Sequence, residues 1–157
     1  METDIVDIKI RNAKKSDSKD IFEWRNDELT RQMSHTSKII EWENHVTWYS
    51  NSLDLENCIL LICEDYDNEK IAVTRFDISE SSAIISINLN PIWRGKNLAK
   101  LCLIKSIEFF SREYSEINSL IAEIKEDNFA SQKTFLGIGF AKYNLEDNIG
   151  SYVKKLV

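Results

Sequence analysis

One short basic loop carries the residue types best suited to binding an anion. It runs from Arg94 to Ala99 with the sequence Arg-Gly-Lys-Asn-Leu-Ala, between the alternating apolar segment Ile84 to Leu89 and a long apolar segment. These patterns predict a strand before the loop and a helix after it. The start of a helix presents backbone N–H groups without partners and the positive end of the helix dipole, so anions are stabilised there. The loop is therefore a candidate phosphate-binding site.

The composition limits the classes of protein to consider. The chain has 157 residues, of which 43% are hydrophobic and 29% are charged, as in an ordinary globular domain. This length gives room for one domain with a core, and no change in composition marks a boundary. The net charge of −6 and the dispersed basic residues argue against a nucleic-acid-binding protein. We therefore expect a single domain over residues 1–157 that does not bind nucleic acid.

The cysteines and the apolar runs bear on location. Cys58, Cys63 and Cys102 are odd in number, lie in apolar runs and lack metal-ligand spacing, so we interpret them as buried side chains in a reducing compartment and expect no metal site. On a strand, Cys58 and Cys63 would point to opposite faces. The N-terminus has no signal-peptide pattern, and no apolar run approaches the roughly 20 residues that span a bilayer. These features predict a cytoplasmic protein that does not bind a membrane.

Apolar periodicity predicts the order β-α-α-β-β-β-α-β-α-β-β. The predicted strands cover residues 5–11, 57–64, 69–78, 84–89, 117–124, 140–143 and 149–156. The predicted helices are one that begins at the Ser16-Asp17 cap and carries Ile21 to Leu29, one over residues 39–53, one that starts near Leu98, and one over residues 128–136. This order is that of a mixed α/β fold around one central sheet.

The helix predicted over residues 39–53 has one apolar stripe, which we expect to face the core. The stripe consists of Ile39, Trp42, Val46, Tyr49 and Leu53. His45 lies at the border of this stripe and Trp48 lies away from its centre. In this prediction, these two side chains are free to face something other than the core.

Two segments resemble the cofactor signatures of the GNAT acetyltransferases. The loop from Arg94 to Ala99 is similar to the family's Arg/Gln-x-x-Gly-x-Gly/Ala motif, except that Asn97 stands where the family usually has Gly. The segment from Asn128 to Phe140 looks like the second signature, in which an Asn precedes a short helix that ends in Gly-Phe. Together with the order of elements, the resemblance covers nearly the whole chain. It implies the GNAT acyl-CoA N-acyltransferase fold, an α/β fold whose central, mixed, mostly antiparallel sheet contains two splayed strands and is flanked by helices.

The resemblance implies that acetyl-CoA enters the gap between the splayed strands. Its pantetheine arm would pair along residues 87–89, and the loop backbone would bind its pyrophosphate, in agreement with the anion site inferred above. Alternatively, Arg94 and Lys96 are solvated surface cations, while Asn128 could cap a helix as well as bind the cofactor. The implied cofactor-binding residues are Ile87, Asn88, Leu89, Arg94, Gly95, Lys96, Asn97, Leu98, Ala99, Asn128, Ser131, Lys133 and Phe135.

The same resemblance implies how an acetyl group would pass to an amine. The backbone N–H near Leu89 would stabilise the oxyanion. Glu123 resembles in position the general base of ribosomal-protein alanine acetyltransferases, although it could merely face solvent. Many relatives have a Tyr that protonates the departing thiolate where this chain has Phe135, and Tyr49 and Tyr143 are candidate substitutes.

The first two predicted helices resemble those of bacterial enzymes that acetylate the 4-amino group of nucleotide-linked deoxysugars in surface-glycan pathways of the pseudaminic acid type. The similar residues, which would bind the acceptor, are Trp24, Arg25, Asn26, Arg31, His45 and Trp48. Arg25 and Arg31 could pair with a nucleotide diphosphate, and Trp24 or Trp48 could stack on the uracil or the sugar. In the alternative interpretation, Trp24 lies in the core, the arginines form surface ion pairs and His45 is a satisfied border residue.

Two other functions remain open. The first predicted helix also resembles that of ribosomal-type protein N-terminal acetyltransferases. The absence of the usual Tyr would suit a catalytically silent module that binds acetyl-CoA. Dimers are common among relatives, so a homodimer is a further expectation by analogy with the fold alone.

Overall fold

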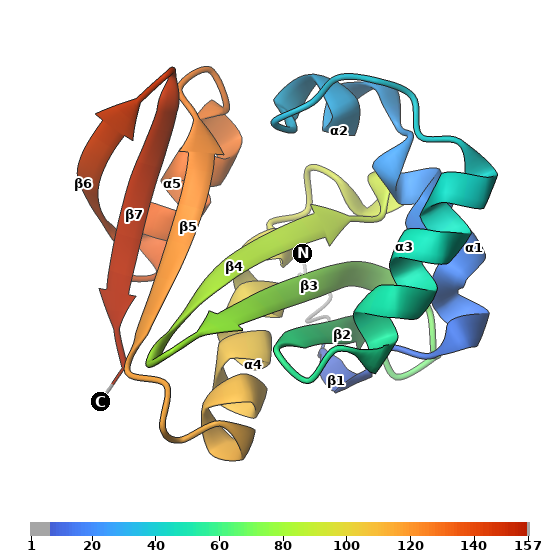
Figure 1. The fold of residues 1–157 in the computed structure, drawn as a ribbon, viewed down its shortest axis with the longest axis horizontal. Helices are drawn as coiled ribbons and strands as arrows, with labels where there is room; N and C mark the ends of the chain where they lie inside the picture. Colours follow the sequence, from blue (N-terminus) through green and yellow to red (C-terminus); the bar gives the residue numbers. More distant parts are fainter. Residues whose placement is uncertain (1–6, 157) are drawn as a thin grey trace, which may run out of the picture.

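A seven-stranded sheet forms the centre of the computed structural model, which describes residues 7–156 (Figure 1). The strands are β1 (Lys9–Asn12), β2 (Cys58–Glu64), β3 (Lys70–Ser79), β4 (Ser82–Leu89), β5 (Ser119–Lys125), β6 (Ala141–Glu146) and β7 (Ile149–Lys155). The helices are α1 (Ser18–Arg25), α2 (Glu28–Met33), α3 (Trp42–Asp54), α4 (Leu98–Glu113) and α5 (Phe129–Gly137), with short 3₁₀ turns at Lys15–Asp17 and Pro91–Trp93. This is the mixed α/β architecture that the sequence predicts. Every helix in the described residues is too short or too polar to span a bilayer.

The two halves of the sheet separate between β4 and β5. The strand order is β1-β2-β3-β4-β5-β7-β6, and all neighbours are antiparallel except β4 and β5. This parallel pair ends at Ile84 and Ile121, although β4 continues to Leu89 and β5 to Lys125. In Figure 1, the two strands meet near the start of β4 and diverge towards α2. The predicted splayed strands are thereby confirmed.

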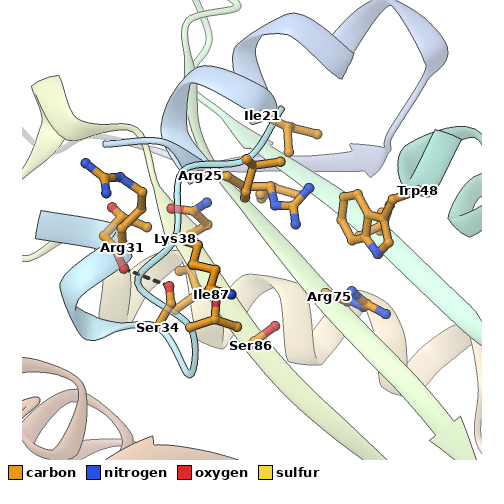
Figure 2. A pocket seen from close by; sticks show the side chains of 15 residues that line it. Ile21, Arg25, Arg31, Ser34, Lys38, Trp48, Arg75, Ser86 and Ile87 are labelled. Carbon is orange, nitrogen blue, oxygen red and sulfur yellow. Dashed lines mark hydrogen bonds between the residues drawn. The ribbon is translucent and has the colours of Figure 1, made fainter. Parts of the chain in front are cut away.

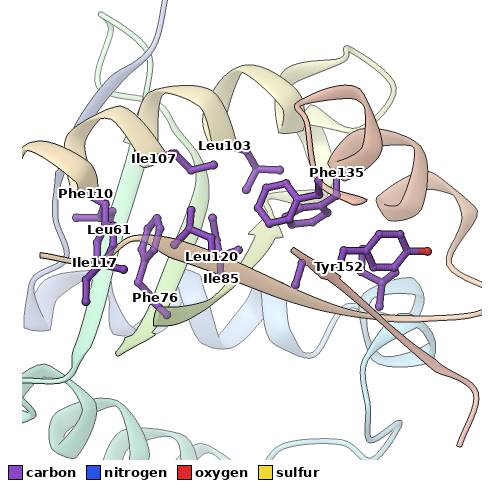
Figure 3. Close-up of a cluster of buried hydrophobic side chains, with 14 residues drawn as sticks. Leu61, Phe76, Ile85, Leu103, Ile107, Phe110, Ile117, Leu120, Phe135 and Tyr152 are labelled. Atoms are coloured by element: carbon purple, nitrogen blue, oxygen red, sulfur yellow. The ribbon is translucent and has the colours of Figure 1, made fainter. Parts of the chain in front are cut away.

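Helices cover both faces of the sheet. On one face, Phe76 of β3 stacks on Phe110 of α4 with ring centroids 4.1 Å apart, within the main core cluster (Figure 3). On the other face, α1 and α3 pack against β2 and β3 through residues such as Ile62. Because side chains alternate along a strand, a strand covered on both sides is apolar throughout. Cys58 and Cys63 accordingly lie buried in clusters on opposite faces, as predicted.

The single N-terminal helix of the prediction is wrong, because the chain forms two helices, α1 and α2. The break lies at Asn26 and Asp27. The Asn26 side chain donates to the carbonyl of Ile40 (2.8 Å) and accepts from its N–H (2.7 Å), while Asp27 caps α2. Such local side-chain hydrogen bonds compete with continued helix. Leu29 therefore lies on α2, where it is exposed.

The predicted apolar stripe of α3 is confirmed only in part: Tyr49 is buried and Leu53 packs against the same cluster, but the other three members are exposed. The helix begins at Trp42, and the residues it buries are His45, Tyr49 and Ser52. Ile39 and Val46, which were expected in the core, are 68% and 40% exposed. A polar side chain can take a core position when its hydrogen bonds are satisfied, and both ring nitrogens of His45 have partners. Apolar spacing alone therefore placed Ile39, Trp42 and Val46 wrongly and missed the burial of His45.

The remaining elements differ from the prediction mainly at their ends. The last hairpin extends beyond the predicted strand ends because Asp147 and Asn148, with φ of 52° and 64°, form a two-residue turn that suits the twist of the flanking strands. The first strand is Lys9–Asn12. Ile5 and Val6, which the prediction included in it, lie outside the described residues.

A buried carboxylate joins three parts of the chain. Asp17, which is 1% exposed, accepts a hydrogen bond from Arg11 of β1 (2.8 Å) and pairs with Lys70 of β3 (2.7 Å). The backbone N–H of Lys14 also donates to it (2.8 Å). Burial by itself would raise the pKa of Asp17, but the bonds from Arg11 and Lys70 outweigh it and hold the pKa well below its ordinary value. Asp17 thus remains charged and fixes the start of α1 on the sheet.

Replacing Asp17 with Asn should lower the free energy of unfolding by about 1–3 kcal/mol, because charge-assisted hydrogen bonds are lost at a buried site while Arg11 and Lys70 each keep a second carboxylate, Glu64 and Asp20. Urea unfolding followed by circular dichroism measures the change. Asp20→Asn is the matched control: that carboxylate also contacts Lys70 (2.8 Å), but its side chain is 45% exposed, so the loss should be less than about 1 kcal/mol. Equal losses in the two variants would contradict the role given to the buried carboxylate.

Candidate functional site

A cleft of about 1010 Å³ lies where β4 and β5 diverge. Its walls are the end of β4, the loop with the first turn of α4, and α5, and residues of α2 also line it. Every residue predicted to bind the cofactor lines this cleft except Lys96. The segments that the sequence singled out separately are therefore neighbours in space.

The loop before α4 has the backbone of an anion site. Gly95 and Asn97 have φ of 76° and 57°, so Asn97 takes the left-handed conformation that Asn tolerates better than most residues. A Cβ on Gly95 would meet no atom within 4 Å, so the loop surface is open there. No side chain caps α4, and its first turn has no acidic residue. The N–H groups at this helix start are therefore available to a phosphate.

The edge of β4 presents backbone groups to the cleft. The N–H of Asn90 donates to the carbonyl of Ile71 (2.8 Å), so the adjacent antiparallel pair, Ala72 with Leu89, is not hydrogen-bonded. The N–H of Leu89 and, two residues earlier, that of Ile87 consequently point away from β3 and towards the gap. An extended ligand could pair with them as a further strand would.

Two buried polar atoms of the cleft lack hydrogen-bond partners among residues 7–156. They are the acceptor Oδ1 of Asn88 and the donor Nε1 of Trp93. Buried polar groups are rarely left unpaired, and each exception asks for an explanation such as a ligand. Together with the open loop and the edge of β4, these atoms make the cleft suitable for a molecule with a pyrophosphate and amide groups, as acetyl-CoA has.

The two predicted cations of the loop have other contacts. Arg94 forms an ion pair with Asp27 and donates to Thr30 Oγ1 (2.9 Å), so it ties the loop to α2. The hydrogen bond from Arg94 holds the pKa of Asp27 below its ordinary value. Lys96 lies outside the cleft, with its Nζ 5.0 Å from the ring centroid of Trp93. Lys100, which was not predicted from the sequence, does line the cleft. A cation in the first helical turn after the loop would have indicated it as a residue that binds an anion.

The start of α5 forms the far wall of the cleft. Asn128 accepts a hydrogen bond from the N–H of Ser131 (3.2 Å), so it caps α5, as the structural alternative anticipated. Phe135 is 3% exposed and packs edge-to-face on Phe140 with centroids 5.1 Å apart. It lies at the base of the wall and has no hydroxyl.

A second cavity, of about 280 Å³, lies on the face of the sheet that α1 and α3 cover (Figure 2). It meets the first: the residues that line both are Thr30, Ser34, Ile87 and Asn88. We call the region of these four residues the junction. Arg25, Arg31 and Trp48, which were predicted to bind the acceptor, line this second cavity.

The other three predicted acceptor residues lie elsewhere. Trp24 is 5% exposed and packs in the core, so it has no face to offer a ligand. Asn26 is occupied by its two bonds to Ile40. His45 is completely buried. The sequence could not separate these side chains from their neighbours because the break between α1 and α2 decides which of them face the cavity.

His45 supports a cavity residue instead. Arg25 Nη1 donates to its Nδ1 (2.9 Å), and its Nε2–H donates to the carbonyl of Ser18 (2.8 Å), because a guanidinium can only donate and a carbonyl can only accept. Burial, only partly opposed by the bond to Ser18 and assisted by the charge of Arg25, lowers the pKa of His45. The ring is therefore neutral and holds Arg25 in place.

The predicted catalytic carboxylate lies near these cavities but lines neither. Glu123 is exposed on β5, beyond the last pair with β4, and it shares the face of Ile121 rather than the core face of Ala122. Neither candidate tyrosine lines a cavity: Tyr49 is buried against α1 and donates to the carbonyl of Lys14 (2.5 Å), and Tyr143 is 57% exposed on β6. No cluster of His, Cys, Asp and Glu suited to a metal ion occurs in residues 7–156.

Comparison with solved structures shows the same fold in proteins of low sequence identity. A spermidine N-acetyltransferase from Vibrio cholerae, in complex with CoA and spermine, superposes with a TM-score of 0.85 at 13% identity over 94% of this chain and 95% of that chain. A protein assigned as a phosphinothricin N-acetyltransferase superposes with a TM-score of 0.81 at 21% sequence identity, over 96% of this chain and 99% of that chain. The protein yncA from Salmonella typhimurium is assigned as an acetyltransferase and was solved with its cofactor acetyl-CoA. It superposes with a TM-score of 0.76 at 18% sequence identity, over 96% of this chain and 95% of that chain.

The sequence itself identifies the family. No curated protein matches this chain, but the family described as "Acetyltransferase (GNAT) domain" matches residues 7–141, which is most of its length. The fold, the open loop before α4 and the edge of β4 agree with this match. The chain therefore belongs to the GNAT family and is an N-acetyltransferase that uses acetyl-CoA.

Proposed function

We propose that this protein acetylates the primary amine of a nucleotide-linked amino sugar, with the 4-amino group of a UDP-linked deoxysugar as the leading candidate. The observation that carries the proposal is the junction, where the cofactor cleft meets a cavity lined by Arg25, Arg31, Lys38 and Arg75 and by no acidic residue. Such a cavity favours an anionic acceptor, as a sugar nucleotide is. The sequence resemblance of Arg25, Arg31 and Trp48 supports the same acceptor.

Three parts of the chain would hold the cofactor. The N–H groups from Gly95 to Ala99 would bind its pyrophosphate, and the backbone of Ile87 and Leu89 would pair with its amide groups. Lys100 would add a positive charge beside the loop. When bound, acetyl-CoA supplies the acetyl group in the activated form of a thioester.

The junction supplies the groups that would orient the reactants. The N–H of Leu89 can donate to a carbonyl oxygen and so stabilise negative charge on it. The unpaired Oδ1 of Asn88 can accept a hydrogen bond from the acceptor amine. Thr30 of α2 and Ser34, the residue after this helix, also line this region. The amine would thus be held beside the β4 edge along which the cofactor lies.

Proton transfer would depend on a group outside the cavities. In residues 7–156, no Asp, Glu, His or Tyr lines either cavity. Glu123 lies on the face of β5 that carries Ile121 and would remove the amine proton through a water. Phe135 has no proton to give, so this chain supplies no acid at that position. A thiol has a reference pKa near 8.5, so the thiolate of CoA can depart without a general acid.

A smaller anionic amine is the second candidate. The volume of the second cavity, about 280 Å³, is at the lower end of the roughly 300–1,000 Å³ of ligand pockets. A nucleotide would therefore extend beyond it, whereas an amine the size of an amino acid would fit inside. A polyamine such as spermidine suits it least, because four cations line the cavity.

Gly95→Glu should weaken acetyl-CoA binding at least about 100-fold, because like charges brought together cost several kcal/mol and the new carboxylate would lie where the pyrophosphate binds. Isothermal titration calorimetry measures the affinity. Gly95→Ala is the control: it brings the same strain at a φ of 76° but no charge, and its Cβ meets no atom within 4 Å, so it should weaken binding less. Wild-type affinity in the Glu variant would contradict the assignment of the loop.

Glu123→Gln should lower kcat by about 10²-fold or more, with little change in the KM for acetyl-CoA, because it removes the proposed base and leaves the cleft intact. Steady-state assays of thiol release give both constants. Glu146→Gln, a change of an exposed carboxylate on β6, should leave kcat unchanged. An unchanged kcat in Glu123→Gln would mean that Glu123 only faces solvent.

A UDP-linked 4-amino-4,6-dideoxy sugar should raise the melting temperature of the CoA-loaded protein, because a ligand that binds only the folded state stabilises it. The same compound with acetyl-CoA should release free thiol. Peptides with a free N-terminus and spermidine should do neither. Turnover of peptides instead would favour an N-terminal acetyltransferase, and cofactor binding without turnover of any amine would favour a silent module.

A further inference from the structure

We propose that Arg25 and Arg75 form an oxyanion-binding subsite in the second cavity, so that the acceptor carries a phosphoryl or carboxylate group about 7 Å from its amine. The inference rests on the proposed transfer to an amine at the junction. It adds a recognition element that the sequence did not indicate, since Arg75 has no place in the signatures of the family.

The two guanidinium groups lie against one aromatic ring. The Cζ of Arg25 is 4.0 Å and that of Arg75 is 5.2 Å from the ring centroid of Trp48. Figure 2 shows Trp48 and Arg75 on the same side of the cavity, with Arg25 beside them. Each cation is attracted by the indole, but the arrangement also brings two like charges together.

Within residues 7–156, one carboxylate, that of Asp77, forms an ion pair with either arginine. Arg75 pairs with Asp77 through its Nε (2.9 Å), which leaves its two Nη groups for another partner. The one side-chain hydrogen bond of Arg25 within residues 7–156 goes to neutral His45. Burial, and after it the charge of Arg75, lowers the pKa of Arg25. Two partly desolvated cations that together have a single carboxylate partner are stabilised when a bound anion supplies a second negative charge.

Arg25 is also held in a fixed position. His45 accepts its hydrogen bond and is itself anchored to the carbonyl of Ser18 (2.8 Å), while Trp48 covers one side of the guanidinium. A guanidinium that is fixed before the ligand arrives loses less conformational entropy on binding. His45, which the sequence placed in direct contact with the acceptor, thus acts through Arg25 as a positioning residue.

The register of the sheet gives the distance between the subsite and the amine. Arg75 lies opposite Ser86 of β4, and Asn88 is two residues further along the same face. Two residues of a strand span about 7 Å. The Cα atoms of Ser86 and Asn88 are therefore about 7 Å apart, which is close to the separation of the amine and the phosphoryl group at the two ends of an extended four-carbon chain.

Titration calorimetry of the CoA-bound protein tests the subsite without turnover. The probes are 4-aminobutyl phosphate, 5-aminopentanoate, neutral 4-aminobutan-1-ol and spermidine. The phosphate, the carboxylate or both should bind at least about 10-fold more tightly than the alcohol and spermidine, and the ratio between the two anions identifies the group that the subsite prefers. Equal binding of the alcohol would overturn the proposal.

Arg75→Gln and Arg25→Gln should each weaken the anionic probe about 10- to 100-fold and leave the alcohol and CoA unaffected. The side chain of Arg75 is 33% exposed, so its variant should fold, and melting curves confirm this. Arg112→Gln, a change of an exposed cation in the last turn of α4, is the control and should bind every probe as the wild type does. Unchanged affinity for the anions in both test variants would overturn the proposal.

These results separate the subsite from the proposed function. If the anionic probes bind in an arginine-dependent way but the UDP-linked sugar is not acetylated, the subsite is supported and the sugar is rejected as the substrate. If both arginine variants acetylate the sugar with the wild-type rate and KM, the sugar is supported as the substrate and the subsite is rejected.

Discussion

The short pairing of β4 with β5 is the constraint on which the site depends. The two strands are paired only from Ser82 to Ile84 and from Ser119 to Ile121. Beyond that point, β4 is still bonded to β3, and β5 is bonded to β7 along its whole length. Each strand is thus kept in place by its other neighbour while one edge stays unpaired. Because unpaired backbone inside a protein is unfavourable, this edge is suited to an extended ligand with amide groups.

The packing around the gap keeps it from closing. The main core cluster continues from α4 to α5, and it includes Ile85 on one side of the gap and Ile124 and Phe135 on the other. Both strands are therefore anchored to the same core while their edges remain apart. The loop before α4 lines the same cleft, and Gly95 and Asn97 give it two residues in the left-handed conformation. The anion site and the strand edge are in this way parts of one cleft.

α2 lies where this cleft meets the second cavity. The helix has only six residues and buries none of them. It is held by Arg94 of the loop on one side and by Lys125 of β5, whose Nζ donates to the carbonyl of Gln32 (3.0 Å), on the other. Since Thr30 and Ser34 line both cavities, any movement of this segment would change both. The two cavities therefore meet beside a helix that buries none of its residues.

The sequence by itself determined the order of most elements, the family, and a set of residues that the fold brings together in one cleft. Those features follow from local patterns, since alternation marks a strand and the Gly-containing loop, like the Asn cap of α5, is read within a few residues. The lining of the second cavity was decided by the tertiary structure. Whether His45 contacts a ligand or supports Arg25 depends on satisfied hydrogen bonds between distant residues, and Arg75 joins the cavity only through the pairing of β3 with β4. Such partners are separated along the chain, so periodicity and spacing do not show them.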